Sequence, residues 1–167
     1  MTDSLTPRLA LPLLAAGQAQ KEMYHNEALA RIDLTLHGNI CAVGEEIPPE
    51  DPVPGQCWIL GNAPTGDWNG HAMEVAGWTE GGWRFVSPCE GMRLWLGLDT
   101  GFATFSGGEW RTGEEYGRVL VDGLQIIGPR GAAIVEPSGG VTVDAEARAT
   151  ILAVLNAMRE HGLVNAD

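Results

Sequence analysis

The sequence predicts an α+β fold in which a turn-rich antiparallel β region lies between two helices. Its 167 residues include 23 glycines and 10 prolines, a density that indicates many turns and short strands. One stretch near each end has the residue preferences and apolar spacing of a helix, whereas the region between them alternates short apolar runs with turn residues. The hydrophobic fraction of 44% is ordinary for a globular protein and is sufficient for a core.

The N-terminal region is expected to form an extended arm, residues 1–17, followed by a helix at residues 18–38. The arm is apolar and contains Pro7 and Pro12, and a residue before proline avoids the helical backbone conformation. Such an arm is expected to lie on its own domain, on a neighbouring subunit or in a partner's groove. The residues that follow it favour helix and repeat apolar positions at spacings of three and four.

The middle of the chain is expected to be a β region. Residues 45–55 combine four prolines with four acidic residues, a composition typical of a linker. Residues 56–140 are expected to form an antiparallel β domain of short hairpins, with Asp122-Gly123 as one of its turns. The strands expected in it are Gln56–Leu60, Met73–Trp78, Trp83–Val86, Met92–Leu98, Phe102–Phe105, Arg118–Val121, Leu124–Ile127 and Ala132–Val135.

The C-terminal region, residues 141–163, is expected to be an amphipathic helix. Asp144 is positioned to cap its N-terminus and Gly162 to end it. Its apolar stripe is expected to pack on the sheet or in a bundle around a symmetry axis. The stripe includes Ile151, Leu155 and Met158.

Charge and cysteine content limit the classes of function. The 22 acidic and 10 basic residues give a net charge of −12, which opposes binding to nucleic acid or to an anionic membrane surface. The apolar run of the arm is short, contains proline and lacks a basic flank, so no signal peptide is expected. Three cysteines without a CxxC motif argue against disulfides; buried free thiols and folding in a reducing cytoplasm are expected instead.

Motifs of catalysis and metal binding are missing from the sequence. The four histidines do not have the spacing of metal ligands, and neither a nucleophile elbow nor a phosphate-binding glycine loop occurs. Glycan hydrolysis needs two carboxylates, and the acidic pairs Glu45-Glu46, Glu50-Asp51 and Glu114-Glu115 are candidates only by their number. They lie in polar connections, where carboxylates are ordinarily solvated. The chain is therefore expected to be no enzyme and to bind no metal or cofactor.

Six tryptophans suggest carbohydrate binding as an alternative function, because the flat faces of sugars stack on exposed indole rings. Trp68 is the best candidate, since polar turn residues flank it, and Asn69 and His71 are expected to add hydrogen bonds. The competing interpretation is that the tryptophans pair across hairpins and fill a thin β core.

Distinctive sequence motifs are spread over almost the whole chain. The most distinctive is Pro7–Leu29, which contains AGQAQKE and HNEAL. The other segments are Pro54–Trp58, Gly66–Trp68, Gly81–Phe85, Glu90–Trp95, Leu124–Ile134 and Asp144–Leu163. Together they resemble a family of uncharacterised proteins found in alphaproteobacterial prophages and gene transfer agents. The chain departs from that pattern at Met158, where leucine is usual.

The resemblance implies a structural protein of a virion, a phage-like particle, with no catalytic residue. In gene transfer agents such a protein resembles the base of the spikes on the capsid vertices. That base holds a fibre, which contacts the surface polysaccharide of the recipient cell. The implied partners are further copies of the chain, capsid vertex proteins and the spike fibre. A pentamer matches a vertex and is favoured, whereas a trimer would match a fibre. The alternatives are a polysaccharide-binding module and a glycan hydrolase.

An assembly interface is expected on the apolar arm and on the apolar faces of both helices, because these surfaces need a partner. The residues expected in this interface are Leu9, Leu11, Leu13, Leu14, Gln18, Gln20, Met23, Asn26, Ile151, Leu155 and Met158.

Overall fold

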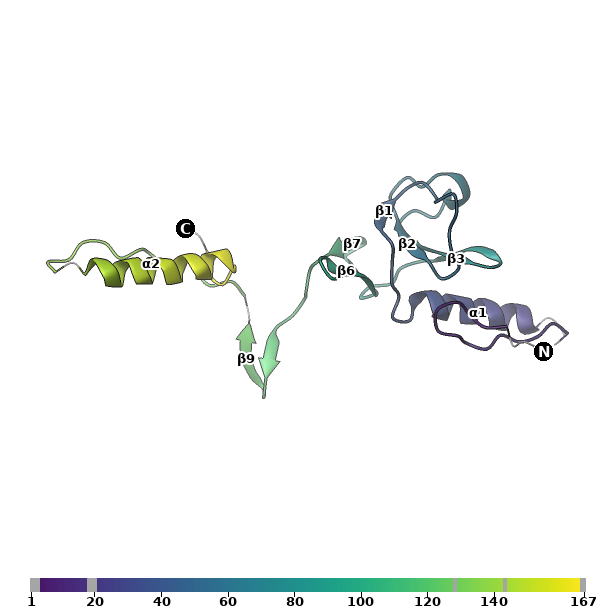
Figure 1. Cartoon of the computed structure of the whole chain (residues 1–167), viewed down its shortest axis with the longest axis horizontal. Coiled ribbons are helices and arrows are strands. Elements are labelled where there is room, and N and C mark those ends of the chain that lie inside the picture. The colour runs from purple at the N-terminus through teal and green to yellow at the C-terminus, as the bar shows by residue number, and fades with distance from the viewer. Residues whose placement is uncertain (1–3, 18–20, 128, 143, 166–167) are drawn as a thin grey trace. The chain divides into compact units, whose positions relative to one another are not determined.

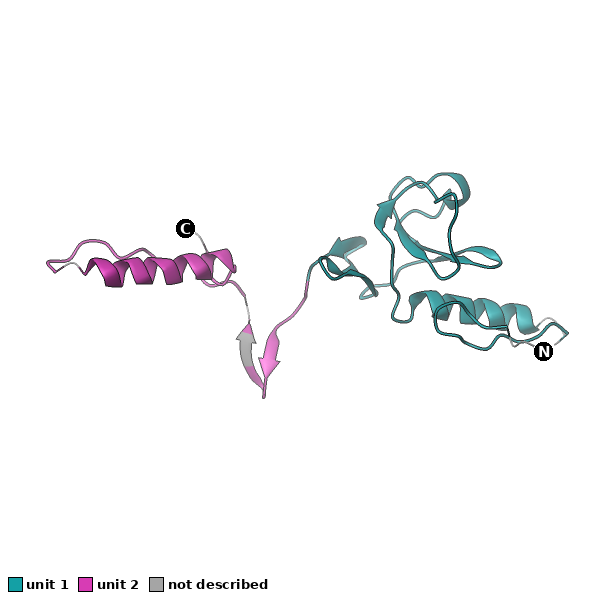
Figure 2. Ribbon diagram, in the orientation of Figure 1, with its two compact units in different colours: residues 1–114 teal, residues 115–167 magenta. Residues whose placement is uncertain are grey.

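The protein separates into two compact units, Met1–Glu114 and Glu115–Asp167 (Figure 2). The computed structural model describes residues 4–17, 21–127, 129–142 and 144–165 (Figure 1). It contains two α-helices and antiparallel-rich sheets of short strands among these residues, which confirms the predicted α+β class.

The first unit consists of a helix and two small sheets. Its elements are α1 (Lys21–Thr35), β1 (Val43–Glu45), β2 (Cys57–Leu60), the 3-10 helix η1 (Gly66–Trp68), β3 (Val75–Thr79), β4 (Gly82–Val86), β5 (Arg93–Gly97), β6 (Gly101–Ser106) and β7 (Glu109–Thr112). The first sheet has the order β1-β2-β3-β4, in which β1 runs parallel to β2 and the other pairs are antiparallel. The second sheet is the antiparallel meander β5-β6-β7.

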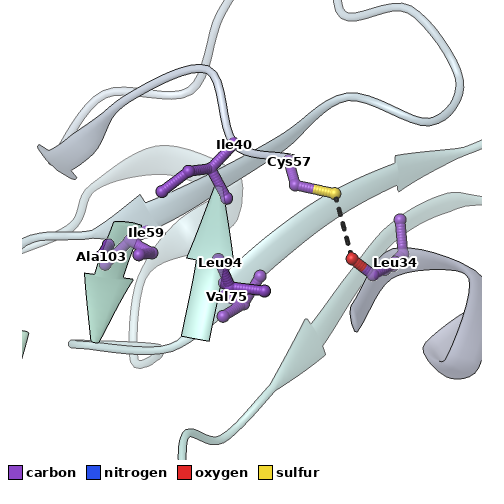
Figure 3. Close-up of a cluster of buried hydrophobic side chains, with 7 residues drawn as sticks. All are labelled: Leu34, Ile40, Cys57, Ile59, Val75, Leu94 and Ala103. Carbon is purple, nitrogen blue, oxygen red and sulfur yellow. Dashed lines mark hydrogen bonds between the residues drawn. The ribbon is translucent and has the colours of Figure 1, made fainter. Parts of the chain in front are cut away.

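One hydrophobic core joins α1 to both sheets (Figure 3). Leu34 of α1, Ile59 of β2 and Leu94 of β5 are fully buried in it. Because each sheet and the helix supply residues to the same cluster, none of the three can separate without exposing the apolar side chains of the others.

The opposite face of the first sheet carries a second core, which is rich in tryptophan. Side chains along a strand point alternately to the two faces, so Ile59 of β2 enters the first core and Trp58 and Leu60 enter the second. All four residues of β2 are buried as a result. The second core comprises Trp58, Leu60, Trp68 and Ala76, with Trp78, Trp83 and Phe85 packed around them.

All three cysteines are free, as expected, but only one is buried. The Cys57 thiol lies in the first core, 3.9 Å from the carbonyl oxygen of Leu34 (Figure 3). Burial raises the pKa of this thiol to about 12, so it stays protonated at neutral pH. Cys41 and Cys89 are exposed, and the expectation that they are buried is wrong.

The second unit contains a β-hairpin and the C-terminal helix: β8 (Val119–Val121), β9 (Leu124–Ile127) and α2 (Ala145–Glu160). The strands pair around the predicted turn at Asp122 and Gly123, both of which have positive φ. Helix α2 begins at the predicted cap, where Asp144 Oδ1 accepts a hydrogen bond from Ala147 N at 2.8 Å.

The strand predicted at Ala132–Val135 is wrong. In this segment of the second unit, Gly131 makes only an isolated bridge with Val164. Arg159 of α2 then donates to the carbonyl oxygen of Ile134 at 3.1 Å and to the Glu136 carboxylate at 3.0 Å. The segment therefore lies along the helix and its arginine instead of pairing with a strand.

Helix α1 sits close to the first sheet because position 77 has no side chain. A Cβ atom placed on Gly77 of β3 would overlap the terminal methyl groups of Leu34. The leucine thus occupies the space that a larger residue at position 77 would fill.

We expect Leu34→Ala to lower the free energy of unfolding by about 2–5 kcal/mol and Gly77→Ala to lower it by about 1–3 kcal/mol. In the double variant the added methyl group occupies part of the space vacated by the leucine, so the combined loss should be smaller than the sum. Urea unfolding followed by tryptophan fluorescence measures all three. Strictly additive losses would contradict the contact.

Candidate functional site

The N-terminal arm folds back on itself and lies on its own domain, against α1. Leu5 and Pro12 form an antiparallel bridge, and Thr6 N donates to Leu11 O at 3.0 Å. The chain reverses between them, where Ala10 has a φ of 53°. The arm therefore lies on its own domain, which is one of the three places expected for it. It is a folded loop rather than one straight segment.

A buried carboxylate near the end of α1 holds this loop. Asp33 is 1% exposed and accepts hydrogen bonds from Thr6 Oγ1 at 2.7 Å, Leu9 N at 2.6 Å and Arg8 N at 3.1 Å. The guanidinium of Arg8 donates to the carbonyl oxygens of Asp33 and His37. Three donors and a neighbouring cation compensate the buried charge.

A second attachment lies further along the arm, at Leu14. The side-chain amide of Asn26 accepts from Leu14 N at 2.9 Å and donates to Leu14 O at 3.0 Å. Two residues expected in an assembly interface therefore bind each other within one chain.

The remaining residues expected in the interface are distributed between buried and exposed positions. Leu9, Leu11, Leu13 and Met158 are half-buried, Met23 and Ile151 are exposed, and Leu155 is buried. Gln18 and Gln20 lie outside the described residues. The exposed positions are available to a partner.

We expect Asp33→Ala to destabilise the protein by about 2–5 kcal/mol, because the Thr6 hydroxyl and the Leu9 N–H lose an ionised acceptor. Hydrogen exchange of the Leu9 amide should accelerate strongly. Asn26→Ala is the control: it releases only Leu14 and should cost about 1 kcal/mol. Unchanged protection of Leu9 in the aspartate variant would contradict the proposed role of the carboxylate.

An apolar cleft of about 610 Å³ lies between the arm, α1 and the turn that joins β3 to β4. Leu5 and Leu13 line it from the arm and Met23 from the helix. The ion pair between Glu27 and Arg84 lies in its wall, with Arg84 Nε 2.6 Å from Glu27 Oε2.

A polar groove of about 590 Å³ shares the same ion pair with the cleft. It is lined by Glu27, Arg31, His71, Glu74, Trp83, Arg84, Phe85, Val86 and Ser87, which come from α1, from β4 and from the segments next to the sheet. In it the imidazole of His71 stacks on Phe85, with ring centres 3.6 Å apart and an interplanar angle of 4°. These residues together are called the polar groove.

Two carboxylates of the polar groove are each held by two neighbours. Glu74 accepts from Ser87 Oγ at 2.5 Å and lies 2.7 Å from His71 Nδ1. Glu27 accepts from Arg84 Nε at 2.6 Å and from Arg31 Nε at 3.0 Å. The protein's own hydrogen bonds therefore fix the positions of both carboxylates.

These partners lower the pKa of both carboxyls. Burial alone would raise the pKa of Glu27, but hydrogen bonds from Arg31 and Arg84, together with their charges, bring it below its ordinary value. Burial acts the same way on Glu74, and the hydrogen bonds from Ser87 and His71 outweigh it, so this pKa is also lowered.

Stability should consequently fall in acid. A carboxyl with a lowered folded-state pKa stabilises the fold above its ordinary pKa of 4.5 and loses that effect as the pH falls through the lower value. We expect Glu27→Gln and Glu74→Gln each to flatten the decrease of the melting temperature between neutral pH and pH 3. Glu109→Gln, at an exposed strand position, should keep the wild-type slope. A slope unchanged in all three variants would rule out this linkage.

The structure places Trp68, the main carbohydrate-binding candidate, in the second core. Its exposed fraction is 0%, so its ring has no face available to a sugar and the expected exposure is wrong. Trp83 packs edge-on against it with ring centres 5.2 Å apart, and Trp58 lies at 6.0 Å. The competing interpretation, tryptophans that fill a thin β core, is confirmed for Trp58 and Trp68. Asn69 is exposed beside them.

Of the three predicted sugar-binding residues, His71 lies in the polar groove. Sequence reasoning missed Glu27, Arg31, Glu74 and Phe85. Glu27 and Arg31 are four positions apart in α1 and Glu74 is three positions from His71, but no spacing in the sequence brings these two pairs and Phe85 together.

The Ser87 hydroxyl donates to Glu74 and not to His71, so these two residues do not form the serine–histidine pair that activates a serine nucleophile in many hydrolases. Within the described ranges no group of three or more histidine, cysteine or acidic residues could hold a metal ion. Neither described helix is long and apolar enough to cross a membrane.

Comparison with models of protein families gives a match. The profile of a family described as "Protein of unknown function (DUF2793)" matches residues 25–111. This range begins in α1 and ends in β7, so it covers the helix and both sheets of the first unit. No curated protein matches the chain.

Proposed function

We propose a structural function for this chain, which belongs to the DUF2793 family of proteins of unknown function: it assembles into an oligomeric base in a phage-like particle. In this proposal the base attaches to a capsid vertex and holds the fibre that contacts the recipient cell. The chain acts by assembly and not by catalysis.

The observation that carries the proposal is the apolar surface of the second unit. Among its described residues only Leu155 and Val164 are buried apolar side chains. Its exposed large apolar residues are Tyr116, Val119, Leu120, Val121, Leu124, Ile127, Ile134, Val135, Val141, Ile151, Val154 and Leu163. Apolar surface of this density marks an interaction site, and its burial against a partner favours assembly.

The hairpin of this unit also needs a neighbour. A two-stranded sheet is marginally stable in water, and all three residues of β8 are exposed, so neither face of that strand is covered. Both edges of the hairpin leave backbone N–H and C=O groups available for pairing.

The proposed occupant of this surface is a second copy of the chain. Residues 115–167 carry seven acidic and four basic side chains, compared with fifteen and six in residues 1–114. Two copies therefore repel each other less through the second unit than through the first. Copies arranged around a symmetry axis would each turn this surface toward the axis and contact their two neighbours through it, in a pentamer at a vertex or in a trimer at a fibre.

The sequence motifs support the particle itself as the setting. Their resemblance to proteins of alphaproteobacterial prophages and gene transfer agents covers both helices and the hairpin region. The proposed partners beyond the chain itself are the capsid vertex proteins and the spike fibre.

We expect the full-length protein to sediment as an oligomer of its 17.8 kDa chain. Leu124→Glu and Val154→Glu place a charge in the apolar surface and should shift the equilibrium to monomer. Leu98→Glu is the matched control, because Leu98 is 94% exposed in a turn of the first unit. Analytical ultracentrifugation distinguishes the species. A wild-type monomer at high concentration, or equal effects of all three substitutions, would count against assembly through the second unit.

The particle itself can be tested in a cell that produces it. Antibody against the protein should label capsid vertices in electron micrographs of purified particles, and particles made without the protein should lack spikes. Normal spikes in its absence would overturn the proposed function.

A further inference from the structure

The polar groove has the features of a small-molecule site in a part of the chain that the proposed function does not use. It lies wholly within the first unit, and its volume falls in the range of pockets that hold small ligands. Its lining combines aromatic rings with a few fixed polar groups, which is the usual composition of such sites.

The groove offers a flat aromatic surface. His71 and Phe85 are parallel at 3.6 Å, and Phe85 in turn packs on the second core. The imidazole is therefore supported from beneath, while its side chain remains 37% exposed. A rigid, half-exposed ring of this kind can receive the apolar C–H face of a sugar ring without a conformational change.

The polar groups retain capacity for hydroxyl groups. The two oxygens of a carboxylate can accept about four hydrogen bonds, and for Glu74 those from Ser87 and His71 are recorded. Arg31 is more than half exposed and uses its Nε on Glu27, while a guanidinium has about five N–H donors in total. Acceptors and donors thus stand side by side, as neighbouring hydroxyls of a sugar require.

With His71 in its neutral form, the charges of the groove balance. Glu27 and Glu74 face Arg31 and Arg84, and the Arg31 charge helps to lower the pKa of Glu74. An anionic ligand needs an excess of cationic side chains, which the groove does not have, and the chain as a whole carries a charge of −12.

From this arrangement we infer that the polar groove binds a neutral sugar unit, stacked on His71 and hydrogen-bonded to Glu74, Ser87 and Arg31. The inference concerns binding and not cleavage. Glycoside hydrolysis needs one protonated carboxylic acid at working pH, and both carboxyls of the groove have lowered pKa values. It does not rest on the proposed assembly, because no residue of the second unit takes part.

Titration of the full-length protein with a panel of sugars tests the inference. The neutral probes are glucose, galactose, mannose and N-acetylglucosamine with their short oligomers, and the anionic probes are glucuronic and N-acetylneuraminic acid. We expect at least one neutral probe to perturb the NMR signals of the His71 imidazole and the Trp83 indole, and the anionic probes to bind more weakly. Absence of any such change, or stronger binding of the anionic probes, would overturn the inference.

Variants then locate the site. His71→Ala should weaken binding about tenfold, equivalent to about 1.4 kcal/mol, and Ser87→Ala should weaken it severalfold. Ser106→Ala is matched to the latter, because Ser106 Oγ donates to Glu90 Oε1 at 2.8 Å in another hairpin, outside the groove, and it should bind as the wild type does. Asn69→Ala tests the loop first expected to bind sugar. Loss of binding in the Asn69 variant with retention in the His71 variant would refute the groove, and thermal unfolding of each variant separates lost binding from lost fold.

Discussion

The insertion of Leu34 against Gly77 is the contact on which the rest of the first unit depends. It fixes the end of α1 on the first sheet, and the buried Leu34 also reaches the second sheet through the shared core. The next residue back, Asp33, holds the N-terminal loop. Arg31 lies one turn before Leu34 in α1 and Glu27 two turns before it, and both reach the polar groove. A single helix position thus determines where the loop, the cleft and the groove lie.

Local patterns were enough to predict much of the fold. The Asp144 cap, the Asp122-Gly123 turn and the strands β2 to β6, β8 and β9 follow from short-range chemistry, and each is present. The failures concern tertiary contacts. Ala132–Val135 has strand-like residues but no strand beside it, and Trp68 has polar neighbours in sequence but indole rings as its neighbours in space.

The candidate site was predictable only in part, for the same reason. His71 was singled out from its position near a tryptophan, yet it lies in the groove because it stacks on Phe85. Glu27 and Arg84 are 57 residues apart in the chain, and no spacing rule brings them together. The arm shows the converse case: its apolar character suggested a partner, and the buried carboxylate that binds it belongs to its own helix.

The distribution of aromatic residues gives the two units different optical properties. All six tryptophans lie between positions 58 and 110, and four of them, Trp58, Trp68, Trp78 and Trp83, form a chain of ring contacts no longer than 6.0 Å. Indole fluorescence therefore reports on the first unit alone, whereas the second unit has no tryptophan. A fluorophore placed on the hairpin of the second unit and excited outside the absorption band of tryptophan reports on that unit, so intrinsic emission and the introduced label can follow sugar binding and self-association independently in one sample.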